Sequence, residues 1–166
     1  MKTEIPASTL LAPVPAVMVS CGDMHTSDIV TIAWAGTVNS DPPMLSISVR
    51  RSRYSYGLIK ATGEFVVNLV DAALLHTLDG CGVVSGRDVD KFEKFHLTRQ
   101  KCSRVSAPAV AECPVSLECV VRETVELPSH VMFIAEIVGV TADERWMRGG
   151  KLYIPEGAPV AYVQNR

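Results

Sequence analysis

Hydrophobic and polar residues alternate in several short stretches of the chain, which is the pattern of β-strands buried on one face. The stretches that show it most clearly are residues 45–50, 64–69 and 117–122. Residues 131–140 are almost wholly apolar, as in a strand covered on both faces. Shorter runs at 16–20 and 29–34, apolar or rich in β-branched residues, predict two more strands.

Helical signals are fewer and shorter. Ser52 is a candidate N-cap for a helix running to Ala61, because Gly63 just past its end can adopt the left-handed conformation that ends helices. Further helices are predicted at residues 72–78 and 88–95. Residues 97–114 carry charges, two prolines and several small side chains, and predict a surface loop. Residues 127–130 predict the turn between the last two long strands.

About six strands at short spacing, with helices inserted between them, predict a mainly β fold. The arrangement favours a mostly antiparallel barrel over a doubly wound parallel sheet. The 166 residues contain no repeat or evident linker, so we expect a single domain spanning residues 1–166. Hydrophobic residues make up 48% and charged residues 20% of the chain, an ordinary composition for a folded protein.

Composition also narrows the function. The net charge of −2 argues against an extended nucleic-acid surface, although it allows a local phosphate site. No apolar run is long enough to span a membrane, and Pro13 and Pro15 interrupt the apolar N-terminal stretch. The five cysteines show no metal-ligand or redox-dithiol spacing, so we expect reduced thiols and no metal. We therefore predict a cytoplasmic protein that binds neither nucleic acid nor membrane.

The strongest candidate for binding chemistry is the passage from the predicted strand 45–50 into the helix after it. It brings Arg50, Arg51, Ser52 and Ser55 together at a helix start. Backbone N–H groups, hydroxyls and guanidinium groups in this combination can bind an anion. A capped helix with solvated arginines explains the same residues equally well, and the local chemistry leaves both interpretations open.

Three further features are weaker when taken singly. Arg87 and Lys91 near the Ser85-Gly86 turn could bind an anion or could form surface ion pairs. Small residues around Trp34 would let a flat ring approach the backbone, although a buried tryptophan is the more common case. His130 could reach a ligand, but a lone histidine more often has a structural role. The chain has no Ser-His-Asp arrangement, dinucleotide loop or Gly-Lys-Ser/Thr phosphate loop.

Together and in this order, these stretches resemble the flavin reductase-like family and, within it, the flavoredoxin-type branch. The resemblance covers roughly residues 10–141, and its motifs are Thr31-Ile-Ala-Trp34, Asp41-Pro-Pro43, Ser52-Arg-Tyr54, Gly63-Glu-Phe-Val-Val-Asn-Leu69, Ser85-Gly-Arg-Asp-Val-Asp-Lys-Phe92, Ala111-Glu-Cys-Pro114 and Leu117-Glu-Cys119. No single motif is decisive, but the ordered set is specific. The fold that the resemblance implies is an antiparallel FMN-binding split β-barrel.

The resemblance also implies the cofactor and its contacts. Ala33, Trp34, Ala35 and Gly36 would lie along the isoalloxazine ring of FMN, with Asp28 and His130 nearby. The phosphate and ribityl chain would lie near the candidate anion site, with contacts from Arg50, Arg51, Ser52, Ser55 and Lys91. Family members continue past an aromatic-glycine segment, whereas this sequence stops soon after Val163. Tyr153 and Tyr162 are candidates to complete that side of the pocket.

The activity implied is an NAD(P)H-dependent flavin oxidoreductase, in which FMN passes electrons to a small-molecule or protein acceptor. The alternative is a flavoredoxin-like electron carrier with tightly bound FMN and little NAD(P)H turnover. A barrel that binds another phosphorylated or haem-like ligand, or none, is a third possibility. The family also implies a homodimer in which the partner subunit helps to close the flavin site.

Overall fold

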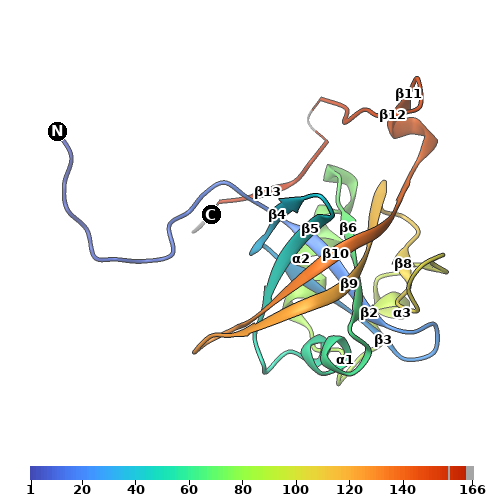
Figure 1. The fold of residues 1–166 in the computed structure, drawn as a ribbon, viewed down its shortest axis with the longest axis horizontal. Helices are drawn as coiled ribbons and strands as arrows, with labels where there is room; N and C mark the ends of the chain where they lie inside the picture. The colour runs from blue at the N-terminus through green and yellow to red at the C-terminus, as the bar shows by residue number, and fades with distance from the viewer. Residues whose placement is uncertain (157, 164–166) are drawn as a thin grey trace.

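A seven-stranded antiparallel sheet forms the centre of the computed structural model, which describes residues 1–156 and 158–163 (Figure 1). Its order is β3-β2-β6-β9-β10-β5-β4. The strands are β2 (Val17–Gly22), β3 (Ser27–Ile32), β4 (Ala35–Ser40), β5 (Pro43–Val49), β6 (Glu64–Leu69), β9 (Val115–Glu126) and β10 (Val131–Ala142). Because β3 and β4 remain as edges, the sheet curls without closing. The prediction of a mainly antiparallel split barrel is confirmed.

Short elements surround this sheet. The helical ones are α1 (Tyr54–Thr62), η1 (Ala72–Leu74), α2 (Leu75–Val83), α3 (Lys91–Lys94) and η2 (Glu144–Trp146). Three two-stranded pairs complete the described fold: β1 (Val14–Pro15) with β13 (Ala161–Tyr162), β7 (Arg99–Gln100) with β8 (Ala109–Val110), and β11 (Met147–Arg148) with β12 (Lys151–Leu152). The first residues run away from the body as an extended arm, and β13 returns beside its base (Figure 1).

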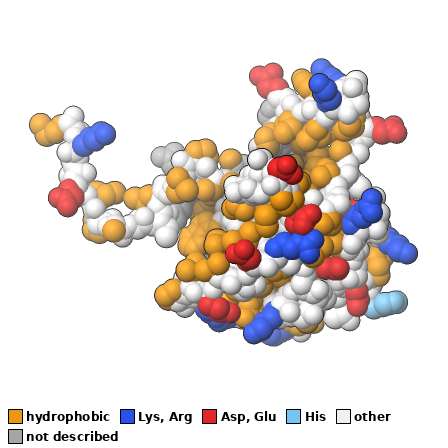
Figure 2. All heavy atoms as spheres, viewed as in Figure 1, with side chains coloured by type: hydrophobic (Ala, Val, Ile, Leu, Met, Phe, Trp, Pro, Cys, Tyr) orange, Lys and Arg blue, Asp and Glu red, His pale blue; other side chains and the backbone are white. Residues whose placement is uncertain are grey.

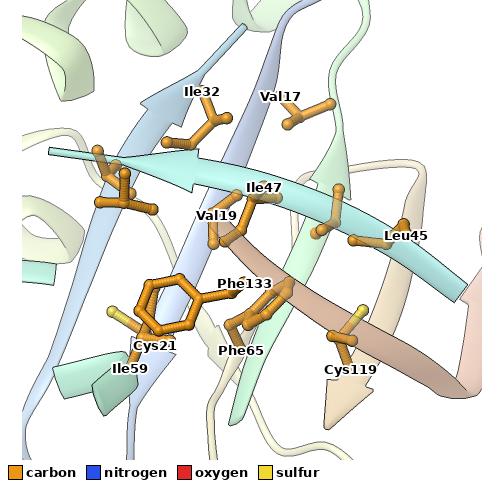
Figure 3. Close-up of a cluster of buried hydrophobic side chains, with 14 of the residues drawn as sticks. Val17, Val19, Cys21, Ile32, Leu45, Ile47, Ile59, Phe65, Cys119 and Phe133 are labelled. Carbon is orange, nitrogen blue, oxygen red and sulfur yellow. The ribbon is translucent and has the colours of Figure 1, made fainter. Parts of the chain in front are cut away.

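Alternation along the strands builds the main core. In β2, Val17, Val19 and Cys21 face the inside of the curled sheet. Phe65 of β6 and Phe133 of β10 lie at the centre of this cluster (Figure 3). Ile59 from α1 joins the same cluster and is fully buried, so α1 packs across the sheet through that side chain.

A second cluster lies on the other face of the same strands. Met18 of β2 and Ile29 of β3 pack against Leu78 of α2 and Phe92 of α3. Both helices therefore cover the outside of the edge formed by β2 and β3. As a result, the loop that joins α2 to α3 is held beside the start of β3, next to the functional site.

The structure corrects three local predictions. Helix α1 begins at Tyr54, and Arg53 rather than Ser52 occupies the N-cap position, with no side-chain cap. The helix predicted at 88–95 is confined to α3, because the Asp90 side chain caps it by accepting hydrogen bonds from the Phe92 and Glu93 amides. The predicted end at Gly63 is confirmed, with φ of 69°.

The third correction concerns residues 97–114, which are not simply a surface loop. They contain the β7–β8 pair, and Val105, Ala107 and Ala109 pack against Val66 in a small third cluster. Asn68 of β6 holds the segment in place, since its side-chain oxygen accepts a hydrogen bond from the amide at 110 at 3.0 Å. Long-range polar contacts of this kind are invisible in the local pattern of the sequence.

The arm leaves apolar side chains in solvent. Met1, Ile5, Leu10 and Leu11 are all more than half exposed. Figure 2 shows hydrophobic atoms along the arm and on the adjoining part of the body. No helix in the described residues is long and apolar enough to cross a membrane.

Candidate functional site

Three adjoining cavities lie along β3 and beside the end of β5. The basic cavity, of about 400 Å³, is lined by Asp28, Arg50, Ser52, Arg53, Tyr54, Ser55, Val84, Ser85, Gly86, Arg87 and Lys91. The central cavity, of about 310 Å³, shares Arg50 and Arg53 with the basic cavity. The apolar cavity, of about 520 Å³, shares Ala33, Trp34 and Ser48 with the central cavity. The three cavities therefore form one continuous row.

The basic cavity lies where β5 passes into α1, against the loop that follows α2. The first N–H groups of an α-helix have no acceptor within the helix, so the start of α1 offers donors to this cavity. Arg87 closes the opposite side, where its guanidinium donates to the Ser52 carbonyl at 2.9 Å. Arg53 is held in a similar way, by donating to the Gly82 carbonyl at 3.1 Å.

Arg50 occupies the junction of the basic and central cavities. It is exposed, and within residues 1–156 and 158–163 its guanidinium makes no hydrogen bond or ion pair. A guanidinium without a protein partner, beside the start of a helix, is well suited to bind an anionic group.

The floor of the basic cavity is a buried polar cluster. Asp28 at the start of β3 and Lys91 of α3 form an ion pair of 3.1 Å, and both side chains are almost fully buried. The Ser55 hydroxyl of α1 donates to the other carboxylate oxygen of Asp28. Lys91 also donates to the Ile29 and Cys81 carbonyls.

Strand register assembles the central cavity. Val131 of β10 pairs with Val49 of β5, so His130 lies beside Arg50. The Ser48 amide donates to the Trp34 carbonyl at 3.0 Å, which holds Trp34 next to the same strand. The Trp34 and His130 rings then meet, with centroids 4.6 Å apart and planes tilted by 39°.

The surroundings of His130 favour the uncharged form of its ring. Burial, and then the positive charge of Arg50, lower the pKa of this histidine. Its Nδ1 is 2.8 Å from the Ser129 hydroxyl. The imidazole and the indole together give the central cavity an aromatic lining, which suits the approach of another aromatic ring system.

Ten of the eleven predicted site residues line these cavities. Asp28, Arg50, Ser52, Ser55 and Lys91 line the basic cavity, whereas Ala33, Trp34, Ala35, Gly36 and His130 line the other two. Arg51 is the exception. Its guanidinium donates to the Leu127 carbonyl at 2.9 Å and pairs with Glu126, so it lies on the β9–β10 turn, away from the cavities.

The structure adds residues that the predicted set did not include. Arg53 and Arg87 bring further positive charge, and both stand in the basic stretches of the sequence that suggested an anion site. Thr31 lines the central cavity, and so does Tyr162, which the resemblance offered as a candidate to complete the pocket. Tyr162 is brought there because β13 pairs with β1, and no local sequence signal predicts that pairing. Tyr153 instead packs under Arg148, 3.6 Å from its guanidinium.

Comparison with known proteins identifies the family of this chain. The profile of the flavin reductase like domain matches residues 10–164, nearly the whole chain. The chain belongs to the flavin reductase-like family. It is therefore a member of a flavin-binding protein family.

Solved structures agree with the family assignment. Flavoredoxin of Desulfovibrio vulgaris (Miyazaki F) is similar with a TM-score of 0.91 and 33% identity, over 99% of this chain and 89% of that one. Flavoredoxin from Methanosarcina acetivorans is similar with a TM-score of 0.90 and 29% identity, over 99% and 87%. An uncharacterized protein of Archaeoglobus fulgidus is 34% identical over 122 residues, which are 74% of this chain and 69% of its own.

Proposed function

We propose that this flavin reductase-like protein binds FMN along the row of cavities and passes electrons from NAD(P)H through the flavin to an acceptor. The observation that carries the proposal is Arg50, whose guanidinium has no partner among the described residues and lies where the basic and central cavities meet. A phosphate ester joined to a flat ring needs this sequence of environments, first cationic and then uncharged and aromatic.

The phosphate would lie in the basic cavity. Arg50, Arg53 and Arg87 line it, and Ser52 together with the first amides of α1 adds uncharged donors. The ribityl chain would pass Arg50 and Arg53 into the central cavity, because these residues belong to both.

The isoalloxazine ring would lie along the end of β3. Thr31, Ala33 and Trp34 line the central cavity there, and the small side chains leave backbone groups accessible to a flat ring. The ring would contact the wall made by Trp34 and His130. Ala35 and Gly36 continue this surface into the apolar cavity, on the side away from the phosphate.

When bound, FMN supplies the redox chemistry, since its ring accepts a hydride and returns electrons to an acceptor. The protein then has to bind and orient the ring, and hydride transfer itself needs no acid or base from the chain. The lowered pKa of His130 is consistent with this role, because it disfavours a positive charge on the histidine beside the ring. Burial raises the pKa of the Cys81 thiol to about 11, so this cysteine is a poor nucleophile at neutral pH.

The second candidate is an electron carrier with tightly held FMN and little NAD(P)H turnover. Two flavoredoxins among the similar structures favour it. Mixing the FMN-loaded protein with NADH or NADPH without oxygen separates the two candidates. We expect the visible flavin absorbance to bleach within seconds to minutes, and absence of bleaching would leave only the carrier. A protein that neither carries flavin nor quenches the fluorescence of added FMN would refute both.

We also propose that the protein is a homodimer in the cytoplasm, in which the partner helps to close the flavin site. The arm exposes several apolar side chains, which are costly to leave in water (Figure 2). Contact with a second copy of the chain would bury them. All five cysteines are unpaired, as expected in a reducing compartment. Light scattering at several protein concentrations tests the dimer, and a monomer with unimpaired FMN binding would contradict it.

A further inference from the structure

Lys91 lines the basic cavity, yet its ammonium group already has polar partners within the chain. The side chain is 3% exposed. An ammonium group has three protons to donate. Two of them go to the carbonyls of Ile29 and Cys81, the second at 3.1 Å, and the ammonium nitrogen also lies 3.1 Å from an oxygen of Asp28 as an ion pair. Buried partners from this chain therefore already surround the charge of Lys91.

Asp28 is enclosed just as fully. One carboxylate oxygen accepts from the Ser55 hydroxyl. The other makes no well-aligned hydrogen bond within the described residues, so the ion pair with Lys91 is its polar contact. Gly86 packs directly over this oxygen, because a Cβ placed on Gly86 would come within 2.5 Å of the Asp28 carboxyl carbon and 2.8 Å of the Tyr54 ring.

The contacts of this pair reach four of the elements that line the basic cavity. Asp28 belongs to β3, Lys91 to α3 and Ser55 to α1, while Gly86 belongs to the turn between α2 and α3. A buried pair of opposite charges adds little net charge to the cavity, because the two charges act on a phosphate from nearly the same place. The positive charge that remains is that of Arg50, Arg53 and Arg87.

We infer that Lys91 and Asp28 are positioning residues, an internally neutral pair that holds the walls of the phosphate site, whereas the three arginines bind the phosphate. This inference rests on the proposed binding of FMN. It replaces the expectation, drawn from the family resemblance, that Lys91 itself reaches the phosphate.

A double-mutant cycle tests it. The measured quantity is the phosphate preference, defined as the dissociation constant of riboflavin divided by that of FMN. Lys91→Met leaves a buried carboxylate unpaired beneath the phosphate, so we expect the preference to fall by roughly tenfold or more. In an Asp28→Asn background the same substitution leaves no charge behind, and the preference should change by less than about threefold. Lys94→Met, on the exposed side of the same helix, is the matched control.

If Lys91 bound the phosphate directly, Lys91→Met would lower the preference as strongly in the Asp28→Asn background as in the natural chain, and the inference would be overturned. A general loss of folding would weaken FMN and riboflavin together and would not change their ratio. If the proposed binding of FMN is itself wrong, the unaltered protein will show no phosphate preference, and this result differs from every outcome that concerns Lys91 alone.

A measurement on the unaltered protein keeps the inference testable if the variants do not fold. Trace acetylation of lysines, read by mass spectrometry, compares the protein with and without FMN. We expect Lys91 to be protected to the same extent in both states, because Asp28 and two carbonyls hold it before the cofactor arrives. Protection of Lys91 that appears only when FMN is added, and not with riboflavin, would overturn the inference.

Discussion

Arg50 and its neighbour Arg51 offer a direct test of the phosphate site. They are consecutive in the sequence, both are exposed, and both follow the end of β5. Arg50 lies between the basic and central cavities, whereas Arg51 pairs with Glu126 on the β9–β10 turn. The matched substitutions Arg50→Met and Arg51→Met each remove one positive charge, at two adjacent positions of the chain.

The expected magnitudes follow from these surroundings. A charge-assisted hydrogen bond to a phosphate contributes about 1.5–3 kcal/mol, and the exposure of Arg50 favours the lower end of that range. Arg50→Met should therefore weaken FMN binding by about 1.5 kcal/mol, or roughly tenfold in Kd. The pair of Arg51 with Glu126 is 40% and 58% exposed, so its loss should cost at most about 1 kcal/mol of stability and should not affect flavin binding.

Fluorescence titration of both variants with FMN and riboflavin measures these effects. Riboflavin lacks the phosphate, so Arg50→Met should change its affinity by less than about threefold. Added salt should reduce the difference between the two flavins, because the site is open to solvent. Equal losses for FMN in the two variants, or equal losses of FMN and riboflavin in Arg50→Met, would refute the assignment.

Four further expectations concern single positions. Because folding lowers the pKa of His130, the unfolded chain binds more protons than the folded chain below about pH 6.5. The free energy of unfolding should therefore fall as the pH drops below that value, and it should fall less in His130→Gln. Urea unfolding across pH 5–8 measures both effects. Gly86→Ala places a methyl group against the Asp28 carboxyl and should destabilise the fold by about 1–3 kcal/mol in the same assay. Trp34→Ala, at a side chain 42% exposed, should weaken FMN and riboflavin by the same factor, about 3- to 10-fold, and unequal losses in titration would contradict a role at the ring. Phe133→Ala empties the centre of the barrel and should cost about 3–5 kcal/mol in thermal or urea unfolding.

Much of the sheet could be predicted because strand alternation is a local property. Leu45, Ile47 and Val49 are buried, with partly exposed residues between them, as the alternation predicted. Strand β4 could not be found in this way, because it is an edge strand with nearly every side chain exposed. Its place is set by hydrogen bonds to β5, and those are indifferent to side-chain hydropathy.

The sequence by itself determined the main strands, the end of α1 at Gly63 and the residue types from which an anion site could be built. Tertiary structure decided which of those residues meet. Arg50 faces the cavities, while Arg51 is drawn to Glu126, 75 residues further along the chain. Lys91 is buried through contact with Ile29, 62 residues before it. Local patterns report propensity and burial, but the partner of a long polar side chain depends on which distant backbone carbonyls and carboxylates the fold brings within its reach.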